Sequence, residues 1–336
     1  MGNAKQILLT RSKEFFLLWK HYSFLYALYN ILWWSCFYTR PPFCYKLSTY
    51  AIKKKTAWLD KYIEKKYSHI INKYKNRSTV YTTEPLIENP CIWVFWGQGE
   101  DNMPPLVRAC YKQLTSNNGN VILVTNQNVN EYIELSSIIF DKVKNGKISW
   151  ANYSDIIRNS LLAKYGGLWI DATVWVSSKI PFDRLNIMEI YSVNGEVPAM
   201  PRATRFWTSF EHNWSTWCMW SGKKNNKLYS FVSEMMTAIA IQEPVWPDYV
   251  IQDYLIFYAS HKYQEVGNMF DVIKSFPGKK RNELAAIMND EYSEERYQEL
   301  IKDDYFFKLS FRANWKERTA KNKPTFYSYV IRHKLD

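Results

Sequence analysis

Residues 154–175 read SDIIRNSLLAKYGGLWIDATVW, and this stretch decides the fold class. Its first part predicts a helix that begins at Ser154 or Asp155, because both are favoured N-cap residues. The helix is expected to end at Gly166, since glycine readily adopts the backbone conformation that stops a helix. GLWIDATVWV then predicts one strand, because its apolar residues form a short, nearly continuous run. A helix followed at once by a buried strand is typical of α/β proteins.

Three charged side chains within this stretch are predicted to meet. Asp155 and Arg158 are three residues apart, so they share one face of the helix near its N-terminal end. Asp171 interrupts the apolar strand, where a carboxylate must find partners or face a ligand. The alternative is that Asp171 caps a loop or pairs with Arg158 for structural reasons only. A ligand site is favoured, because α/β proteins bind ligands at the carboxyl ends of their strands.

The sequence on either side continues the alternation of strands and helices. Strands are predicted at 91–97 (CIWVFWG), 120–126 (NVILVTN) and 147–150 (KISW). Helices are predicted at 103–114, 227–240 and 248–261, where MPPLVRACYKQL, KLYSFVSEMMTAIA and DYVIQDYLIFYASH stand. The fold class expected from this order is α/β, with a Rossmann-like, mainly parallel sheet flanked by helices.

Two of these segments resemble a known family. IWVFWGQGEDNMPPLVRAC (92–110) and SDIIRNSLLAKYGGLWIDATV (154–174) are similar to the capsular polysaccharide synthesis family of bacterial glycosyltransferases. More distantly they resemble the group with a GGxYxDxD sugar-binding motif, which includes yeast mannosyltransferases and the large clostridial glucosylating toxins. The resemblance extends over residues 88–320. It implies a GT-A-type domain that moves a sugar from a nucleotide-diphosphate sugar, first of all a UDP-sugar, to a glycan, with retention of configuration.

The resemblance also assigns roles to individual residues. Trp93 or Trp96 would stack on the nucleotide base, and Trp96, beside a glycine, has the freer approach. Asp155 and Arg158 would hold hydroxyls of the donor sugar, and the Arg158 fork could also reach a phosphate. The donor-binding candidates are Trp93, Trp96, Asp155, Arg158, Gly167, Asp171, Thr173, Lys308 and Ser310, of which Asp155, Arg158 and Asp171 are the catalytic group.

The metal part of the motif departs from the family pattern. Asp171 matches the first Asp of DxD and is the candidate ligand for Mn²⁺ or Mg²⁺, but Thr173 stands where the second Asp belongs. A neutral hydroxyl binds a hard dication more weakly than a carboxylate does, so metal dependence is in doubt. FFKLSFR (306–312) resembles a late family motif, which implies that Lys308, Ser310 and Arg312 cover the diphosphate in place of a metal or beside it. A solvated surface lysine is the alternative for Lys308.

Acceptor residues are expected in the aromatic region and the helix that follows it. Trp217 and Trp220 are candidates because indoles pack on sugar rings, although core packing explains these rings, with Trp207 and Trp214, equally well. Asp248 and Asp253 are further candidates to approach the acceptor. Their spacing of five residues does not place them on one helix face.

Charge separates the chain into two parts. Residues 1–80 hold fifteen of the 44 Lys and Arg residues but three of the 32 Asp and Glu, and this difference equals the whole net charge of +12. We therefore predict a basic, aromatic helical region at 1–80 and the glycosyltransferase domain at 85–336. The neutral second part and the lack of a recognition motif argue against nucleic acid as a partner.

The uncharged run at 21–39 is predicted to be a helix lying in or against a membrane surface. Its Tyr and Trp residues are spread through the run, whereas a spanning helix keeps them near its ends. The alternative is an extra core helix. Five scattered cysteines and a polar start without a signal-peptide pattern favour a cytoplasmic protein, peripheral at the inner face of the plasma membrane, with a lipid-linked oligosaccharide as acceptor.

Two alternatives to a glycosyltransferase remain open from the sequence. The same donor site could serve a phosphosugar transferase or a nucleotide-sugar hydrolase. In a different class, Thr173 is compatible with a non-catalytic, membrane-associated scaffold of a polysaccharide assembly complex whose donor site has decayed.

Overall fold

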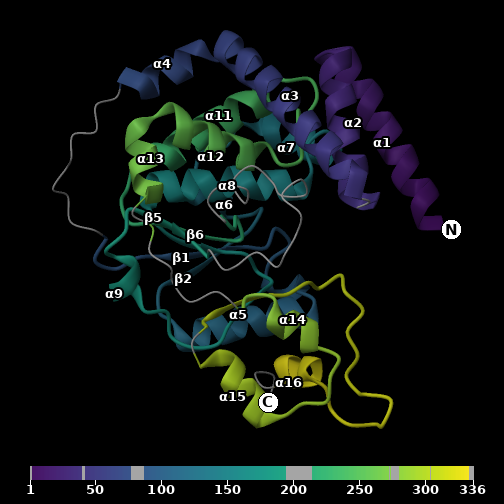
Figure 1. The fold of residues 1–336 in the computed structure, drawn as a ribbon. Helices are drawn as coiled ribbons and strands as arrows, with labels where there is room; N and C mark the ends of the chain where they lie inside the picture. Colours follow the sequence, from purple (N-terminus) through teal and green to yellow (C-terminus); the bar gives the residue numbers. More distant parts are fainter. Residues whose placement is uncertain are drawn as a thin grey trace.

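The computed structural model of the chain describes residues 2–39, 42–76, 87–193, 214–271, 273, 280–302 and 304–332. A five-stranded sheet forms its centre (Figure 1), in the order β2-β1-β3-β6-β5. The strands are β1 (Ile92–Phe95), β2 (Val121–Val124), β3 (Gly167–Ile170), β5 (Ile190–Ser192) and β6 (Cys218–Ser221). β1 runs parallel to β2 and β3, while β6 is antiparallel to β3 and β5. The α/β class is confirmed, with a mixed sheet in which three strands are parallel.

The alternation of side chains along β1 divides the core between the two faces of the sheet. Ile92 and Val94 pack toward α5 (Pro105–Asn117), and Trp93 packs toward the opposite layer. That layer consists of α8 (Trp150–Tyr165), α11 (Lys227–Gln242) and α12 (Ile251–Lys262), which cover the sheet in Figure 1. The helices predicted after the two prolines and at 227–240 are thus confirmed.

The prediction of a strand at KISW (147–150) was wrong, because this segment leads into the start of a helix. Ser149 is the N-cap of α8, and its hydroxyl accepts a hydrogen bond from the Asn152 amide at 3.1 Å. The helix therefore begins at Trp150, four residues before the expected start at Ser154. It ends as predicted at Gly166, whose φ is 66°. Arg158 consequently lies in the third turn of α8 and not at its N-terminal end.

The stretch GLWIDATVWV forms two strands rather than one. β3 ends at Ile170, a turn follows, and β4 (Val174–Val176) leaves the central sheet to pair antiparallel with β7 (Phe306–Lys308). The start of β3 requires its glycine, because Gly167 has a φ of 91° and a Cβ there would lie 2.4 Å from the Cys91 carbonyl oxygen. Asp171 therefore lies in a turn at the carboxyl end of β3 and not, as had been expected, within a strand.

β4 and β7 tie the C-terminal region to the sheet. Trp175 and Phe307 share a core with Leu106 of α5 and with three late helices. These helices are α14 (Glu283–Ile287), α15 (Glu294–Ile301) and α16 (Phe326–Arg332), which lie beside α5 in Figure 1. Short helices complete the connections, namely α6 (Val129–Tyr132), α7 (Ser137–Lys144), α9 (Phe182–Leu185), α13 (Gln264–Asp271) and a 3₁₀ turn at Glu100–Asn102.

Four N-terminal helices lie outside the α11–α12 layer (Figure 1): α1 (Gly2–His21), α2 (Phe24–Thr39), α3 (Pro42–Lys66) and α4 (Ser68–Asn76). Tyr254 of α12 donates to Asp60 of α3 at 2.7 Å, and Tyr74 of α4 donates to Glu234 of α11 at 2.9 Å. The predicted boundary between the two domains lies outside the described residues, so the division stays a prediction.

The apolar run at 21–39 corresponds mainly to α2. Its Tyr26, Trp33 and Trp34 are buried, with exposures of 0%, 0% and 5%. These three rings therefore pack inside the protein, as the core-helix alternative predicts for them. Among the helices of the described ranges, none combines the length and the apolar composition that crossing a bilayer requires.

Candidate active site

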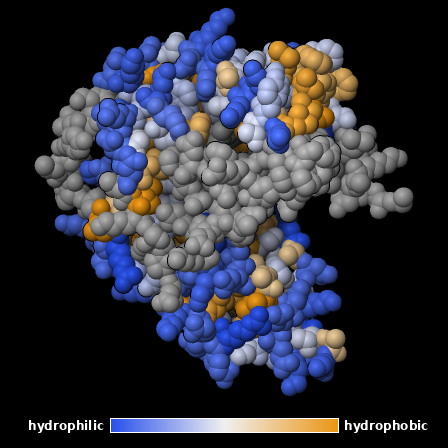
Figure 2. Space-filling model, in the orientation of Figure 1, coloured by the Kyte–Doolittle hydropathy of each residue, from blue (hydrophilic) through white to orange (hydrophobic). Residues whose placement is uncertain are grey.

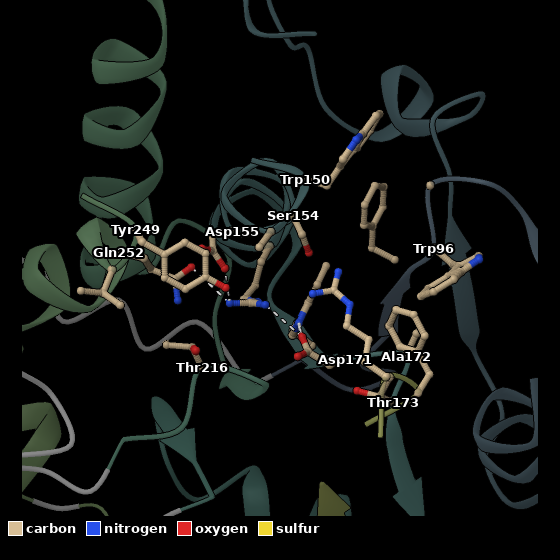
Figure 3. Close-up of a pocket in the computed structure, with 18 of the residues that line it drawn as sticks. Trp96, Trp150, Ser154, Asp155, Asp171, Ala172, Thr173, Thr216, Tyr249 and Gln252 are labelled. Carbon is tan, nitrogen blue, oxygen red and sulfur yellow. Dashed lines mark hydrogen bonds and ion pairs between the residues drawn. The ribbon is translucent and has the colours of Figure 1, made fainter. Parts of the chain in front are cut away.

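A cavity of about 520 Å³ opens at the carboxyl ends of β1 and β3. Trp96 follows β1, Asp171 follows β3, and α8 lies alongside with Asp155 and Arg158. Figure 3 shows the cavity with Trp96 on one side and Tyr249 on the other. The position agrees with the rule that α/β sheets bind ligands beyond the carboxyl ends of their strands.

The floor of the cavity is an Asp–Arg–Asp network. Arg158 donates through Nη1 to Asp155 Oδ1 at 2.7 Å and through Nη2 to Asp171 Oδ1 at 2.9 Å. Its guanidinium lies 4.9 Å from the centre of the Trp169 ring, and only 4% of Arg158 is exposed. The Trp169 ring holds the planar guanidinium of Arg158 in place, and the guanidinium in turn fixes the positions of the two carboxylates that it binds. The structure thus brings together the three residues that were predicted to meet.

Asp171 has a second cation on its other oxygen. Lys308 Nζ lies 2.7 Å from Asp171 Oδ2 and 3.0 Å from Thr173 Oγ1. Oδ1 of the same carboxylate also accepts from Trp169 Nε1 at 2.9 Å. Lys308 is the last residue of β7, so pairing of β7 with β4 delivers this ammonium to the turn after β3. Lys308 is therefore not a solvated surface lysine.

The two carboxylates titrate differently. Burial raises the pKa of Asp155 to about 6, more than its Arg158 partner lowers it. Burial also acts on Asp171, but Lys308 and Arg158 together outweigh it and hold the pKa of Asp171 below its usual value. Asp171 is thus a permanent anion at neutral pH, whereas Asp155 takes up a proton in mildly acidic solution.

Aromatic rings form much of the cavity wall. Trp96 meets Phe311 edge to face, with ring centres 5.5 Å apart. Trp150 and Tyr249 also line the cavity and are 48% and 52% exposed. Exposed rings around a charged floor fit a ligand that carries flat or apolar faces together with polar groups.

Several predicted donor residues lie elsewhere. Trp93 is buried in the core and donates to the Gly166 carbonyl at 2.9 Å, so that of the two predicted stacking residues Trp96 is the one at the cavity. Gly167 shapes the chain against Cys91 and does not line the cavity. Ser310 is exposed, and its hydroxyl accepts from the Arg312 amide at 3.3 Å, while Arg312 itself lines the cavity.

The acceptor candidates are divided in the same way. Asp253 lines the cavity, but Asp248 does not, because it forms a sealed ion pair with Lys55 of α3. Trp220 is fully buried and donates to the Met188 carbonyl at 3.0 Å. The Trp217 ring does not line the cavity, but the Trp217 backbone carbonyl accepts a hydrogen bond from the Asp171 amide at 2.9 Å.

Of the other tryptophans in that region, Trp214 is buried against Phe270, with ring centres 5.0 Å apart. Trp207 lies outside the described residues.

Some cavity residues had not been predicted, namely Trp150, Thr216, Tyr249, Gln252 and Phe311. One signal for Trp150 was present, since Ser149 is a favoured N-cap and a helix from Trp150 places 150, 154 and 158 on one face. The other four come from the region after β5 and from the C-terminal part, and they reach the cavity only through tertiary packing.

The donor set is poor for a divalent cation. Within the described part of the chain, no three His, Cys, Asp or Glu side chains converge on a point that a metal ion could occupy. Hard dications require several oxygen ligands, usually with more than one carboxylate. Of the three aspartates that line the cavity, Asp155 and Asp171 are already engaged by cations.

Comparison with known proteins identifies the family. A family model described as capsular polysaccharide synthesis protein matches residues 44–330, and no curated protein matches the chain. The matched range contains every residue of the cavity described above, nearly all of α3 and the whole of α4. The chain belongs to the capsular polysaccharide synthesis protein family, as its sequence motifs had indicated.

Proposed function

We propose that this member of the capsular polysaccharide synthesis protein family is a glycosyltransferase with a GT-A-type fold. It takes a sugar from a nucleotide-diphosphate sugar, first of all a UDP-sugar, and transfers it to a glycan acceptor. The family indicates a glycosyltransferase-type role. The observation that carries the proposal is the Asp155–Arg158–Asp171 network at the floor of a cavity beyond β1 and β3.

The donor is proposed to lie across this floor. Trp96 stacks on the base, since an exposed indole face accepts any flat heterocycle. Asp155 and Arg158 bind hydroxyls of the sugar, and Asp171 holds the ribose or sugar through its carboxylate. The diphosphate then lies toward Arg312, which lines the cavity, and toward Lys308, which contacts the cavity residue Asp171. We propose retention of configuration, in line with the resemblance to the DxD-motif group.

Catalysis in such a site is mainly electrostatic. The leaving nucleoside diphosphate gains negative charge as the sugar–oxygen bond breaks, and positioned cations stabilise that charge without reorganisation. The exposed Arg312 and the partly exposed Lys308 are suitably charged for this role, whereas the buried Arg158 is already shared by two carboxylates.

Calorimetric titration tests the donor site. The purified protein is titrated with UDP and with a panel of UDP- and GDP-sugars, together with Asp171→Asn and with Asp183→Asn, which makes the same change on α9 outside the cavity. Binding of one donor that Asp171→Asn weakens and Asp183→Asn leaves unchanged supports the proposal. No binding of any donor to the wild type refutes it, and binding without transfer to any glycan would make the chain a scaffold.

The proposed acceptor is a lipid-linked oligosaccharide at the inner face of the plasma membrane. An aromatic corner, formed by Phe16 and Trp19 of α1 with Phe24 and Leu25 of α2, supports it: these side chains are 47–60% exposed. Figure 2 shows an apolar area over these helices. The exposed Lys13 and Lys20 lie on the same helix, so the corner fits an anionic phospholipid surface. The exposed element is therefore this corner rather than the whole run at 21–39.

Liposome flotation tests the membrane contact. We expect the protein to float with phosphatidylglycerol-containing vesicles and less with neutral ones. A Phe16→Ser/Trp19→Ser/Phe24→Ser variant should stay soluble, whereas Ile187→Ser, which changes an equally exposed residue after α9, should behave like the wild type. If light scattering shows dimers that the triple variant abolishes, the corner binds a second copy of the chain instead.

A further inference from the structure

Both oxygens of the Asp171 carboxylate already have cationic or N–H partners. Oδ1 accepts from Arg158 Nη2 and Trp169 Nε1, each at 2.9 Å, and Oδ2 accepts from Lys308 Nζ at 2.7 Å. A dication on Oδ2 would have to displace the ammonium or lie beside it, at a separation where like charges repel strongly. The single carboxylate that matches the DxD motif is thus committed to protein cations.

The ammonium bridges the two side chains of the DxD-like motif. In DAT (171–173), Lys308 Nζ contacts Asp171 and also Thr173 Oγ1, at 3.0 Å. Thr173 is therefore a partner of this ammonium. It supplies a neutral oxygen, which suits a monovalent ammonium, whereas a second carboxylate would suit a divalent ion.

Backbone contacts fix this lysine firmly. The Lys308 amide donates to the Arg281 carbonyl at 2.8 Å, and the Leu309 amide donates to the Thr173 carbonyl at 3.0 Å. Lys308 also stands opposite Val174 in the β4–β7 pair. The backbone of Lys308 is thus tied to the same turn that carries Asp171, which keeps the ammonium within reach of that carboxylate.

We propose that the Lys308 ammonium takes the place of the divalent metal ion, and that donor binding and transfer by this chain are independent of metal. The proposal rests on the glycosyltransferase function proposed above. An ammonium has three N–H donors, and among the described residues two of them have acceptors, which leaves one for a diphosphate oxygen. Lys308 is 28% exposed on its side chain, and with Arg312 it offers the two positive charges that one Mn²⁺ would bring.

The proposed step is balanced without a metal. The bond between the sugar C1 and the diphosphate oxygen breaks, and its electron pair stays on that oxygen. A new bond forms between C1 and the acceptor hydroxyl oxygen, whose proton passes to the departing diphosphate or to water. Lys308 and Arg312 neutralise the charge that develops on the diphosphate, which is where fixed cations lower the barrier most.

Variants that remove the lysine, with or without a second carboxylate in the DxD-like motif, test whether the ammonium replaces a metal ion. UDP and the donor that binds best are titrated in EDTA and in Mn²⁺, and Mn²⁺ binding is followed independently by electron paramagnetic resonance. The variants are Lys308→Ala, Lys308→Arg, and Lys308→Ala/Thr173→Asp, which removes the ammonium and restores the second carboxylate. Lys179→Ala, an exposed lysine outside the cavity, is the control.

The wild type should bind UDP equally in EDTA and in Mn²⁺. Lys308→Ala should lose about 10- to 100-fold in UDP affinity, because a charged hydrogen-bond donor is removed, and Lys308→Arg should lose less. The double variant should bind Mn²⁺ and recover UDP affinity only when Mn²⁺ is present. Lys179→Ala should match the wild type.

Two results would overturn the proposal separately from the function. If the wild type binds UDP only with Mn²⁺, or if Lys308→Ala has unchanged affinity in EDTA, the site is a donor site but Lys308 does not replace the metal. If the wild type binds neither UDP nor any donor under either condition, the glycosyltransferase function fails and this proposal fails with it.

Discussion

Two lysine–aspartate pairs in this chain have the same charges and opposite surroundings. Asp171 lines the cavity and Lys308 is its partner, with side chains 26% and 28% exposed. Lys55 and Asp248 connect α3 to the segment before α12, and neither side chain is exposed at all. Lys55 also donates to Asn30 at 2.6 Å and lies 4.6 Å from the centre of the Trp33 ring. A ligand can reach the partly exposed, open pair of Lys308 and Asp171, whereas the fully buried, sealed pair of Lys55 and Asp248 is closed to one.

The comparison also explains why Asp248 was misjudged. Its neighbour Tyr249 lines the cavity, so the segment is indeed close to the site, but the Asp248 side chain points to the N-terminal helices. Tyr22 and Tyr26 donate to the carbonyls of Val245 and Pro247 in the same segment. An acidic residue near a cavity is therefore a candidate for function only if its carboxylate is open to the cavity.

The largest expected effect is a difference in protein stability between removing the lysine of the sealed pair and removing the lysine of the open pair. Lys55→Met leaves Asp248 buried without its cation, and we expect it to lower the free energy of unfolding by about 3–5 kcal/mol. Lys308→Met removes a partly exposed partner, so its cost should be about 0–1 kcal/mol. Urea denaturation followed by circular dichroism measures both. Equal losses in the two variants would contradict the distinction between a sealed and an open pair.

A double variant sharpens this result. Lys55→Met/Asp248→Leu replaces the sealed pair with apolar side chains, and buried pairs exchanged in this way often lose little stability. We expect an unfolding free energy within about 2 kcal/mol of the wild type. If the double variant is as unstable as Lys55→Met alone, the loss does not come from the unpaired charge.

On the open side, the largest single contribution is expected from Trp96. Stacking of a base on an aromatic ring contributes about 1–3 kcal/mol, so Trp96→Ala should weaken UDP binding by about 5- to 150-fold. Trp150→Ala, at the other aromatic side of the cavity, is the matched control and should affect UDP less. Calorimetry with UDP alone measures the effect. A larger loss in Trp150→Ala would move the base to that ring.

The smallest expected effect is a pH dependence of the open network. Because the pKa of Asp155 is about 6, its carboxylate becomes protonated and its bond to Arg158 weakens as the pH falls below 6. Donor affinity should fall about tenfold between pH 7 and pH 5. Asp155→Asn should abolish this dependence, and titrations across the range test it. An unchanged pH profile in Asp155→Asn would assign the dependence to another group.

The effect of Asp155 on stability has the opposite sign. Its pKa is raised above that of an unfolded aspartate, about 3.9, so the folded state holds the proton more tightly. Its stabilising contribution is complete below about pH 4 and is lost as the pH rises through about 6. Donor binding and stability should therefore change in opposite directions over this interval, which the difference between wild type and Asp155→Asn isolates.

The sequence predicted the parts of the fold that local patterns determine. The strand at Ile92–Phe95, the helix after Pro104 and the end of α8 at Gly166 follow from apolar runs, prolines and glycine. The meeting of Asp155 with Arg158 follows from helical spacing, and that of both with Asp171 follows from the strand end. These are interactions within a short stretch of chain, and their geometry is largely local.

The remaining features depend on contacts distant in sequence. KISW and GLWIDATVWV have strand-like composition, but the Ser149 cap and the departure of β4 toward β7 decide their structure. The contact of Lys308 with Asp171 joins residues 137 positions apart, and Tyr249 reaches the cavity because helices α1–α3 hold its segment. Composition does not show which distant elements pair. The sequence could therefore name Lys308 as a candidate but could not predict its contact with Asp171.

The attachment of residues 243–250 to the first helices has a consequence for synthesis. Tyr62 and Tyr67 donate to Glu243, and Lys55 pairs with Asp248, so α3 binds a segment that the ribosome makes almost two hundred residues later. During translation the early helices have no partner for these polar groups. The wall that carries Tyr249 therefore takes its final position only when helices made early dock on a segment made much later, and the cavity, which also needs Phe311 and Arg312, is completed late in synthesis.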